Sequence, residues 1–94
     1  MSKITKSARG EACEIRLTGV CTRDTEKVVY CHLNGAGMGM KAMDIHGAYG
    51  CSSCHDAIDG RIQTEYTRDE LKLAHLEAVI RTQILLTKKG LINT

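Results

Sequence analysis

The clearest pattern of apolar and polar positions lies in the last third of the chain. Thr67 and Glu70 stand at the spacing of a capping box, which begins a helix. Apolar residues then recur at three- and four-residue spacing until Gly90, at Leu73, Leu76, Ile80 and Ile84. We predict one helix over about residues 68–88, and we expect this apolar stripe to pack in the core. His75, next to the stripe, is expected to be partly exposed.

Shorter elements are predicted upstream of this helix. Residues 27–33, KVVYCHL, are rich in β-branched and apolar residues and predict a strand with His32 near its end. A glycine-rich loop at 35–39 follows, and residues 47–50 predict a brief second strand. The segment SSCHDAID, residues 52–59, can then open a helix.

The composition indicates that something besides aromatic packing stabilises the chain. Its 94 residues include no Phe, no Trp and 3 Tyr, so the side chains that dominate most small cores are nearly absent. A domain of this size buries only about 60–65% of its unfolded surface. The 5 Cys make a bound metal the leading candidate for the missing stabilisation.

The N-terminal sequence, MSKITKSARGEAC, bears on location. It contains no apolar run, so we expect no secretory signal, no membrane-spanning segment and a cytoplasmic protein. In a reducing compartment, cysteines at chelating spacings more often bind metal than form disulfides. We interpret residues 1–94 as a single domain with a flexible basic arm at residues 1–10. The net charge of +2 says little about nucleic acid.

The segment CSSCH, residues 51–55, fits two kinds of site. C-x-x-C-H is the attachment sequence of a c-type haem, and it can also be half of a zinc site followed by a histidine. Haem is disfavoured because Cys13 and Cys21 would have no role and because every Met lies upstream, whereas an axial Met usually lies downstream. A structural zinc needs four ligands, commonly in two pairs, and Cys51 and Cys54 supply one pair.

The second zinc pair must come from the remaining three cysteines. Cys13 and Cys21 are far apart for a knuckle, but a hairpin or extended loop between them would bring them together. Cys31 precedes His32 on a predicted strand, where neighbouring residues point to opposite faces. Spacing therefore favours Cys13 and Cys21, with Cys31 as a small buried hydrophobic residue.

Two histidines flank the predicted zinc pair. His32 ends a strand, and His55 directly follows Cys54 at the start of a helix. In such an arrangement one imidazole can activate water while the other holds a divalent cation. The plainer interpretation is that His32 lies on the surface and that His55 either hydrogen-bonds to a zinc ligand or binds the zinc in place of one of the cysteines. Taken together, the two histidines favour a reactive site.

Three segments resemble a known family: ARGEACEIRLTGVC, CHLNGAGMGMKAMD and CSSCHDAIDGR. They are similar to small lambdoid-phage and prophage proteins typified by YbcO, a family described as nucleases, and more widely to HNH, or ββα-metal, endonucleases. The resemblance is dense over residues 8–61 and weaker in the last helix, chiefly at Arg81-Thr82-Gln83. It implies a small α+β fold with a zinc-stapled, treble-clef-like ββα-metal core and a long C-terminal helix.

The resemblance also implies residue roles. A structural zinc would be held by Cys13, Cys21, Cys51 and Cys54. His32 would be the general base, and His55 would bind a catalytic Mg²⁺ or Mn²⁺. Two departures are plain: Cys31 stands where many HNH enzymes have an acidic metal ligand, and no middle asparagine aligns cleanly. Asp44 and His46 are the nearest candidates for that last position.

The function predicted is a phage or prophage endonuclease that hydrolyses DNA phosphodiesters with a divalent metal. Lys41 is a candidate phosphate contact, and phage recombination proteins are candidate partners. Two other classes stay open. A catalytically silent zinc-binding module that binds DNA or protein would keep the cysteines and need neither histidine. A structural partner protein would use the long helix for dimerisation and show a concentration-dependent mass.

Overall fold

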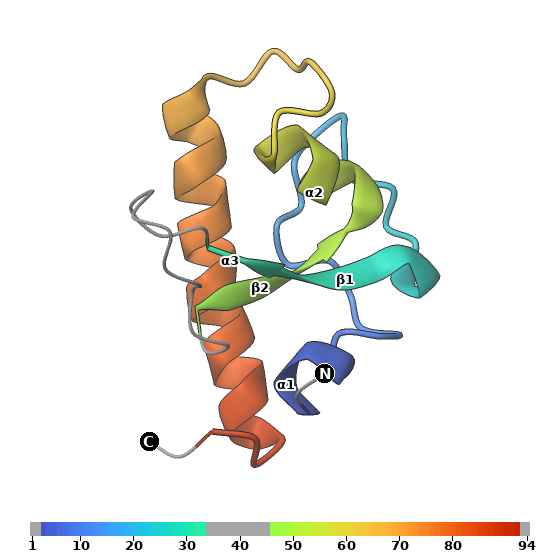
Figure 1. Cartoon of the computed structure of the whole chain (residues 1–94), viewed down its shortest axis with the longest axis vertical. Coiled ribbons are helices and arrows are strands. Elements are labelled where there is room, and N and C mark those ends of the chain that lie inside the picture. Colours follow the sequence, from blue (N-terminus) through green and yellow to red (C-terminus); the bar gives the residue numbers. More distant parts are fainter. Residues whose placement is uncertain (1–2, 34–45, 93–94) are drawn as a thin grey trace.

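The computed structural model describes residues 3–33 and 46–92 of the chain. Its elements, in chain order, are α1 (Lys3–Lys6), the 3₁₀ turn η1 (Thr25–Lys27), β1 (Val28–His32), β2 (Gly47–Cys51), α2 (Ser52–Ile58) and α3 (Arg68–Lys88). The two strands form one sheet, with α3 standing beside it, α2 above it and α1 below it in the view of Figure 1. The fold is therefore small α+β with a long C-terminal helix, as the sequence predicts. No helix within the described ranges is long and apolar enough to cross a membrane.

The sheet is a short antiparallel pair in which Tyr30 lies opposite Tyr49 and His32 opposite Gly47. Every residue of β2 is buried. A Cβ on Gly47 would lie 2.3 Å from Cε2 of Tyr30, and one on Gly50 would lie 2.5 Å from Cδ1 of Ile15. Glycine at these two positions thus lets neighbouring side chains lie directly against the strand.

The helix α3 begins and ends where the sequence predicts. The Thr67 hydroxyl accepts a hydrogen bond from the Glu70 amide at 3.1 Å, and the Glu70 carboxylate accepts one from the Thr67 amide at 2.7 Å. These two contacts are the capping box, and they satisfy amides that the first turn leaves without partners. The helix then continues to Lys88.

The face through which α3 packs is not the predicted one. Its buried residues are His75, Ala78, Val79, Thr82 and Leu86. The stripe expected in the core is exposed instead: Leu73 at 58%, Leu76 at 48%, Ile80 at 61% and Ile84 at 53%. The predictions that this stripe forms the core and that His75 is partly exposed are both wrong.

The physical reason is the close approach of α3 to β2. The Thr82 hydroxyl accepts a hydrogen bond from the Tyr49 amide at 3.1 Å, so the helix lies against the backbone of the strand. Ala78 and Thr82 are both fully buried in this contact. Leu or Ile at these positions would hold the helix away from the strand, because packed interiors leave no room for additional atoms. Small side chains at Ala78 and Thr82 therefore mark the closest approach of α3 to the strand, while the larger His75, Val79 and Leu86 are buried to either side.

The N-terminal segment is part of the folded structure. Where the sequence predicted a flexible arm, residues 3–6 form α1 and Ala8 is 1% exposed. The Ser7 hydroxyl lies 2.7 Å from the hydroxyl of Tyr49, at hydrogen-bond distance. Glu11 forms an ion pair with Lys89 at 2.6 Å, just beyond the end of α3. Residues 7–11 are thus attached both to β2 and to the residue that follows α3.

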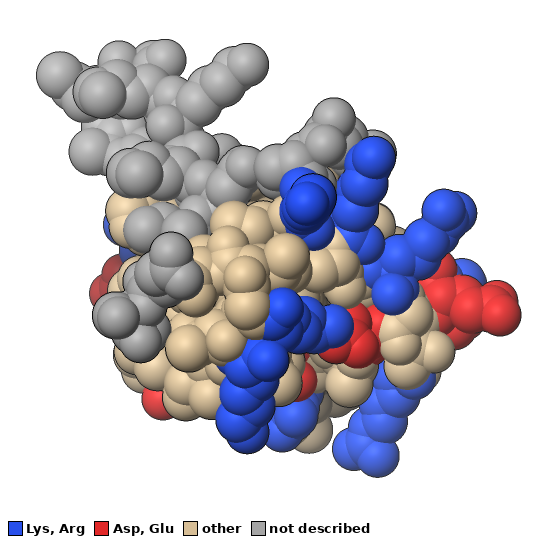
Figure 2. All heavy atoms as spheres, turned by 90° about the horizontal axis from the view of Figure 1, so that it is seen from below, with Lys and Arg blue, Asp and Glu red and all other residues tan. Residues whose placement is uncertain are grey.

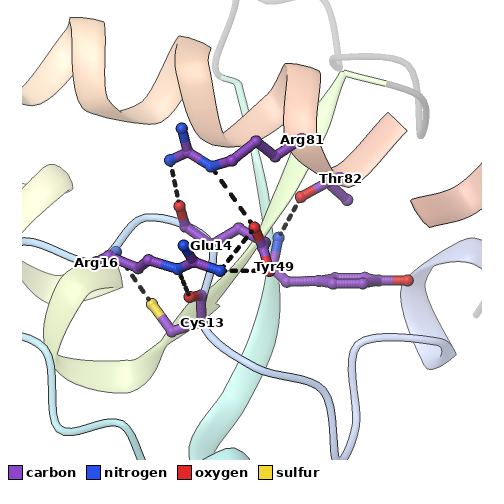
Figure 3. A network of polar contacts seen from close by, with 6 residues as sticks. All are labelled: Cys13, Glu14, Arg16, Tyr49, Arg81 and Thr82. Carbon is purple, nitrogen blue, oxygen red and sulfur yellow. Dashed lines mark hydrogen bonds and ion pairs between the residues drawn. The ribbon is translucent and has the colours of Figure 1, made fainter. Parts of the chain in front are cut away.

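A polar network joins the segment around Glu14 to β2 and α3 (Figure 3). The Glu14 amide donates to the Tyr49 carbonyl at 2.7 Å, and the Arg81 guanidinium donates to the Glu14 carbonyl. The Glu14 carboxylate is nearly buried and lies 3.5 Å from Nε of Arg81 and 3.4 Å from Nη2 of Arg16. A buried carboxylate requires such partners, because isolated burial of a charge is costly. Arg81 and Thr82 thereby fix α3 to the segment that carries Cys13.

Candidate metal centre and histidine site

Four cysteine side chains converge in one cluster. The Sγ atoms of Cys13, Cys21, Cys51 and Cys54 all lie within 4.8 Å of one another. A tetrahedral zinc with Zn–S bonds near 2.3 Å needs S–S separations of about 3.8 Å, and Sγ of Cys21 and Sγ of Cys51 are 3.9 Å apart. All five cysteines of the chain carry free thiols. The four chosen from the sequence are thus brought together, and they could bind a metal such as zinc.

Local turns present these sulfurs to one another. Cys51 is the N-cap of α2, and its Sγ accepts a hydrogen bond from the Cys54 amide at 3.4 Å. Sγ of Cys13 accepts one from the Arg16 amide at 3.5 Å, with Arg16 in the left-handed region at φ 53°. The Cys21 amide donates to the Leu17 carbonyl at 2.9 Å in a turn. Amides directed at sulfur stabilise the thiolate, which is the form that binds metal.

The protonation of the cluster is uneven. A hydrogen bond from the Cys54 thiol lowers the pKa of Cys13 to about 4, and the same contact raises the pKa of Cys54. Burial opposes ionisation of Cys51, but hydrogen bonds from Cys54 and Thr22 outweigh it and lower the pKa of Cys51. Burial raises the pKa of Cys21. Four thiolates this close repel one another, so a divalent cation at their centre is what would allow all four to ionise.

Cys31 lies outside this cluster, as predicted. It is fully buried. Its Sγ and the side chain of Ile15 both pack directly against Gly50, at the position that a Cβ would occupy in any other residue. Burial raises the pKa of Cys31 to about 12, so its thiol stays neutral near pH 7. It therefore packs as a small apolar side chain.

His32 lies at the end of β1, half-buried. Its ring meets the ring of Tyr30 edge to face, with centroids 5.0 Å apart. The exposed residue His46 precedes β2, and its carbonyl accepts a hydrogen bond from the Leu33 amide at 2.7 Å. The predicted glycine-rich loop, with Lys41 and Asp44, lies outside the described residues.

His55 lies on α2 and is paired with an acidic residue one turn later. Its Nε2 is 3.2 Å from Oδ2 of Asp59, and both side chains are partly exposed, at 31% and 25%. Arg61 lies 3.8 Å from the same Asp59 oxygen. The sequence analysis did not assign Asp59 a role, although the four-residue spacing from His55 on a predicted helix is a signal for such a pair.

His75 connects α3 to the end of β1. It is 5% exposed, and its Nε2 lies 2.9 Å from the Cys31 carbonyl, so Nε2 carries the proton and donates it. Burial lowers the pKa of His75, positive charge on His55 lowers it further, and Asp59 raises it. The helix α2, which carries His55, contacts both α3 and β1. The signal that sequence analysis missed was the spacing of His75 with Ala78, Val79 and Thr82.

Basic groups do not form one continuous patch on the end of the molecule seen in Figure 2. Lys and Arg side chains project there at several separate points, with uncharged surface and some acidic groups between them. The two lysines of α1, Lys3 and Lys6, belong to the N-terminal segment. Charge on this face therefore does not by itself define a path for nucleic acid.

Three comparisons relate the chain to known proteins. The sequence model of the family described as "Putative nuclease YbcO" matches residues 2–91. A protein of Escherichia coli K12 named "Putative nuclease YbcO" is 35% identical, with 99% of each chain covered. One of Enterobacteria phage 82, named "Putative nuclease ybcO", shows the same identity and coverage. The solved structure titled "Structure of a putative bacteriophage protein from Escherichia coli str. K-12 substr. MG1655" has a TM-score of 0.79 at 34% identity, covering 93% of this chain and 99% of that one.

Proposed function

This chain belongs to the YbcO family, and we propose on that premise that it is a metal-dependent, HNH-type endonuclease acting on DNA. Both relatives carry the name "Putative nuclease", which fits a hydrolase of nucleic acid. The observation that supports a reactive site in this chain is the position of the His55–Asp59 pair on α2. This helix contacts β1, which ends in His32, and it also contacts α3, whose His75 donates a hydrogen bond to the carbonyl of Cys31.

The proposed architecture is a treble-clef-like ββα-metal core. Two antiparallel strands are followed directly by α2, and the junction between β2 and α2 carries Cys51 and Cys54. Cys13 and Cys21 complete the cluster with donor chemistry that suits zinc. A zinc held by four protein ligands has no open position, so its contribution here would be folding free energy and not catalysis.

His32 is proposed as the general base. At the end of β1 it would take a proton from the water that attacks phosphorus, while contact with the Tyr30 ring limits the orientations of its imidazole. His55 would offer a ring nitrogen to the catalytic cation, with the Asp59 carboxylate either orienting the imidazole or contributing an oxygen. Mg²⁺ or Mn²⁺, when bound, would stabilise the charge that develops on the phosphate and the leaving oxygen.

The test is cleavage of a panel of nicked, branched, duplex and single-stranded DNA with Mg²⁺ or Mn²⁺. His32→Ala should lower the rate by about 10²–10⁴-fold, the usual effect of losing a general base. His55→Ala should lose activity at low metal concentration and recover part of it at high concentration, whereas His32→Ala should not recover. Lys72→Ala, an exposed change on α3, is the control and should cleave like the wild type. Equal cleavage by all four proteins would rule out the histidine site.

A catalytically silent zinc-binding module is the second candidate. It is favoured by Cys31, which stands where many HNH enzymes have an acidic metal ligand and is buried and neutral here. Such a module would bind DNA or a phage recombination protein through its surface. Stoichiometric zinc, an intact fold and no cleavage with any divalent metal would select this alternative.

A further inference from the structure

The outer side of α3 carries a row of apolar residues, which we call the outer stripe and define as Leu73, Leu76, Ile80 and Ile84. Each is about half exposed or more. Single exposed aliphatic side chains are ordinary on protein surfaces, but four at three- and four-residue spacing line one side of a helix as a continuous strip. The side of α3 that packs against β2 carries different residues, such as Ala78 and Thr82. The helix is thus apolar on two sides, and core packing accounts for only one of them.

The pattern along the outer stripe is self-complementary. Leu73 and Ile84 are its two ends, and the inner residues Leu76 and Ile80 match about its middle to within one residue. One exposed pair of opposite charges follows the same symmetry, with Asp69 in the first turn and Lys88 in the last turn. If two such helices cross antiparallel about a two-fold axis, apolar residues meet apolar residues and each Asp69 meets a Lys88 of the other copy. The helix dipoles are also favourably opposed in this arrangement.

We propose that the outer stripe is the contact through which two copies of this chain associate, with their α3 helices antiparallel. The charge symmetry points to a second copy and not to an unrelated partner, because an unrelated protein would not require the two ends of the stripe to complement each other. Four partly exposed side chains per copy make a contact smaller than a standard interface of about 1,600 Å². The dimer is therefore weak, with a dissociation constant on the order of micromolar.

This inference is independent of the proposed nuclease activity. None of the residues of the outer stripe is a cysteine of the metal cluster or a histidine of the proposed site. Loss of DNA cleavage would leave the association unchanged, and loss of association would leave the chemistry of the histidines unchanged.

The first test is sedimentation equilibrium of the full chain with bound zinc, from low micromolar to near-millimolar concentration. The mass should rise from that of one copy toward that of two. Ile80→Lys should raise the dissociation constant by about tenfold or more, the effect of placing a charge in a desolvated contact. Ile62→Lys is the matched control, because Ile62 is 42% exposed and precedes α3, and it should stay within about twofold of the wild type. Circular dichroism and zinc content should be unchanged in both variants.

A charge exchange tests the antiparallel arrangement. Asp69→Lys and Lys88→Asp should each weaken the dimer by about threefold to tenfold, and the double variant should regain most of the wild-type affinity. Rescue cannot arise within one copy, because residues 69 and 88 are about 28 Å apart along the helix and the screening length is about 8 Å at physiological salt. A monomer at every concentration, or equal effects of Ile62→Lys and Ile80→Lys, would overturn the dimer. A double variant as weak as the single variants would overturn the antiparallel contact.

Discussion

Replacing Thr82 with valine tests the contact that decides how α3 lies against the sheet. Valine has nearly the same shape as threonine, so the substitution leaves no cavity and requires no movement of the helix. It removes the hydroxyl that accepts a hydrogen bond from the Tyr49 amide at 3.1 Å. Because every residue of β2 is buried, water does not replace the lost acceptor.

The expected cost follows from the amide that is left without a partner. A buried donor deprived of its acceptor costs about 1–3 kcal/mol. For a domain of fewer than 100 residues, each kcal/mol lowers the melting temperature by about 4–8 °C. A loss near the middle of this range, about 2 kcal/mol, thus corresponds to a decrease of roughly 8–16 °C.

Thr87→Val supplies a matched control on the same helix. The Thr87 hydroxyl donates to the carbonyl of Gln83 one turn earlier, at 2.8 Å. That bond is local and partly exposed, and the backbone can satisfy the same carbonyl, so its loss should cost less than about 0.5 kcal/mol. The two variants therefore make the same chemical change with different expected costs.

The assay is urea unfolding at a fixed excess of zinc, because a bound metal shifts apparent stability by mass action. Amide hydrogen exchange adds a local measurement, in which the Tyr49 amide should lose protection in Thr82→Val. If Thr82→Val and Thr87→Val have equal free energies of unfolding, the hydrogen bond between α3 and β2 does not have the role assigned to it here.

Three further predictions concern residues around the sheet. Cys31→Ala should keep one zinc per chain by metal analysis and lose about 1 kcal/mol through the small cavity it leaves; loss of zinc would contradict its position outside the cluster. Gly50→Ala should destabilise the protein by about 1–3 kcal/mol in urea unfolding, because the new Cβ would lie 2.5 Å from Ile15. Because burial lowers the pKa of His75, the unfolded chain binds a proton first as the pH falls below about 6.5. The wild type should therefore lose more stability than His75→Gln between neutral pH and pH 5, and parallel pH profiles would refute this.

The features that sequence analysis predicted correctly depend on local chemistry. The capping box at Thr67 and Glu70 sets the start of α3, and Gly90, which follows the C-cap Lys89 and has a φ of 74°, sets its end. The convergence of four cysteine sulfurs could be predicted because C-x-x-C supplies one pair and spacing favours Cys13 and Cys21 over Cys31 for the other, whereas zinc binding by them stays a prediction. The roles of His32 and His55 stay predictions, since they depend on a bound cation and on a substrate.

The features that were missed depend on how close two elements approach. Periodicity identifies an apolar side of α3, but it does not reveal that the helix lies against the backbone of β2, where the Thr82 hydroxyl accepts a hydrogen bond from the Tyr49 amide. His75 was misplaced for the same reason, because it lies on the side of the helix with Ala78. The N-terminal helix was missed because its position depends on a distant contact between Ser7 and Tyr49.

The order of the elements along the chain has a consequence for how the protein is made. A ribosome releases Cys13 and Cys21 first, the β2–α2 junction later, and α3 after both. Until then the Tyr49 amide has no partner in Thr82, and a hairpin of two strands is at best marginally stable alone. The cysteine cluster is complete before α3 is made, because its last member, Cys54, precedes that helix. If the cluster binds a metal, a shortage of that metal would leave nascent chains whose strand edge is open to proteases and to pairing with other chains.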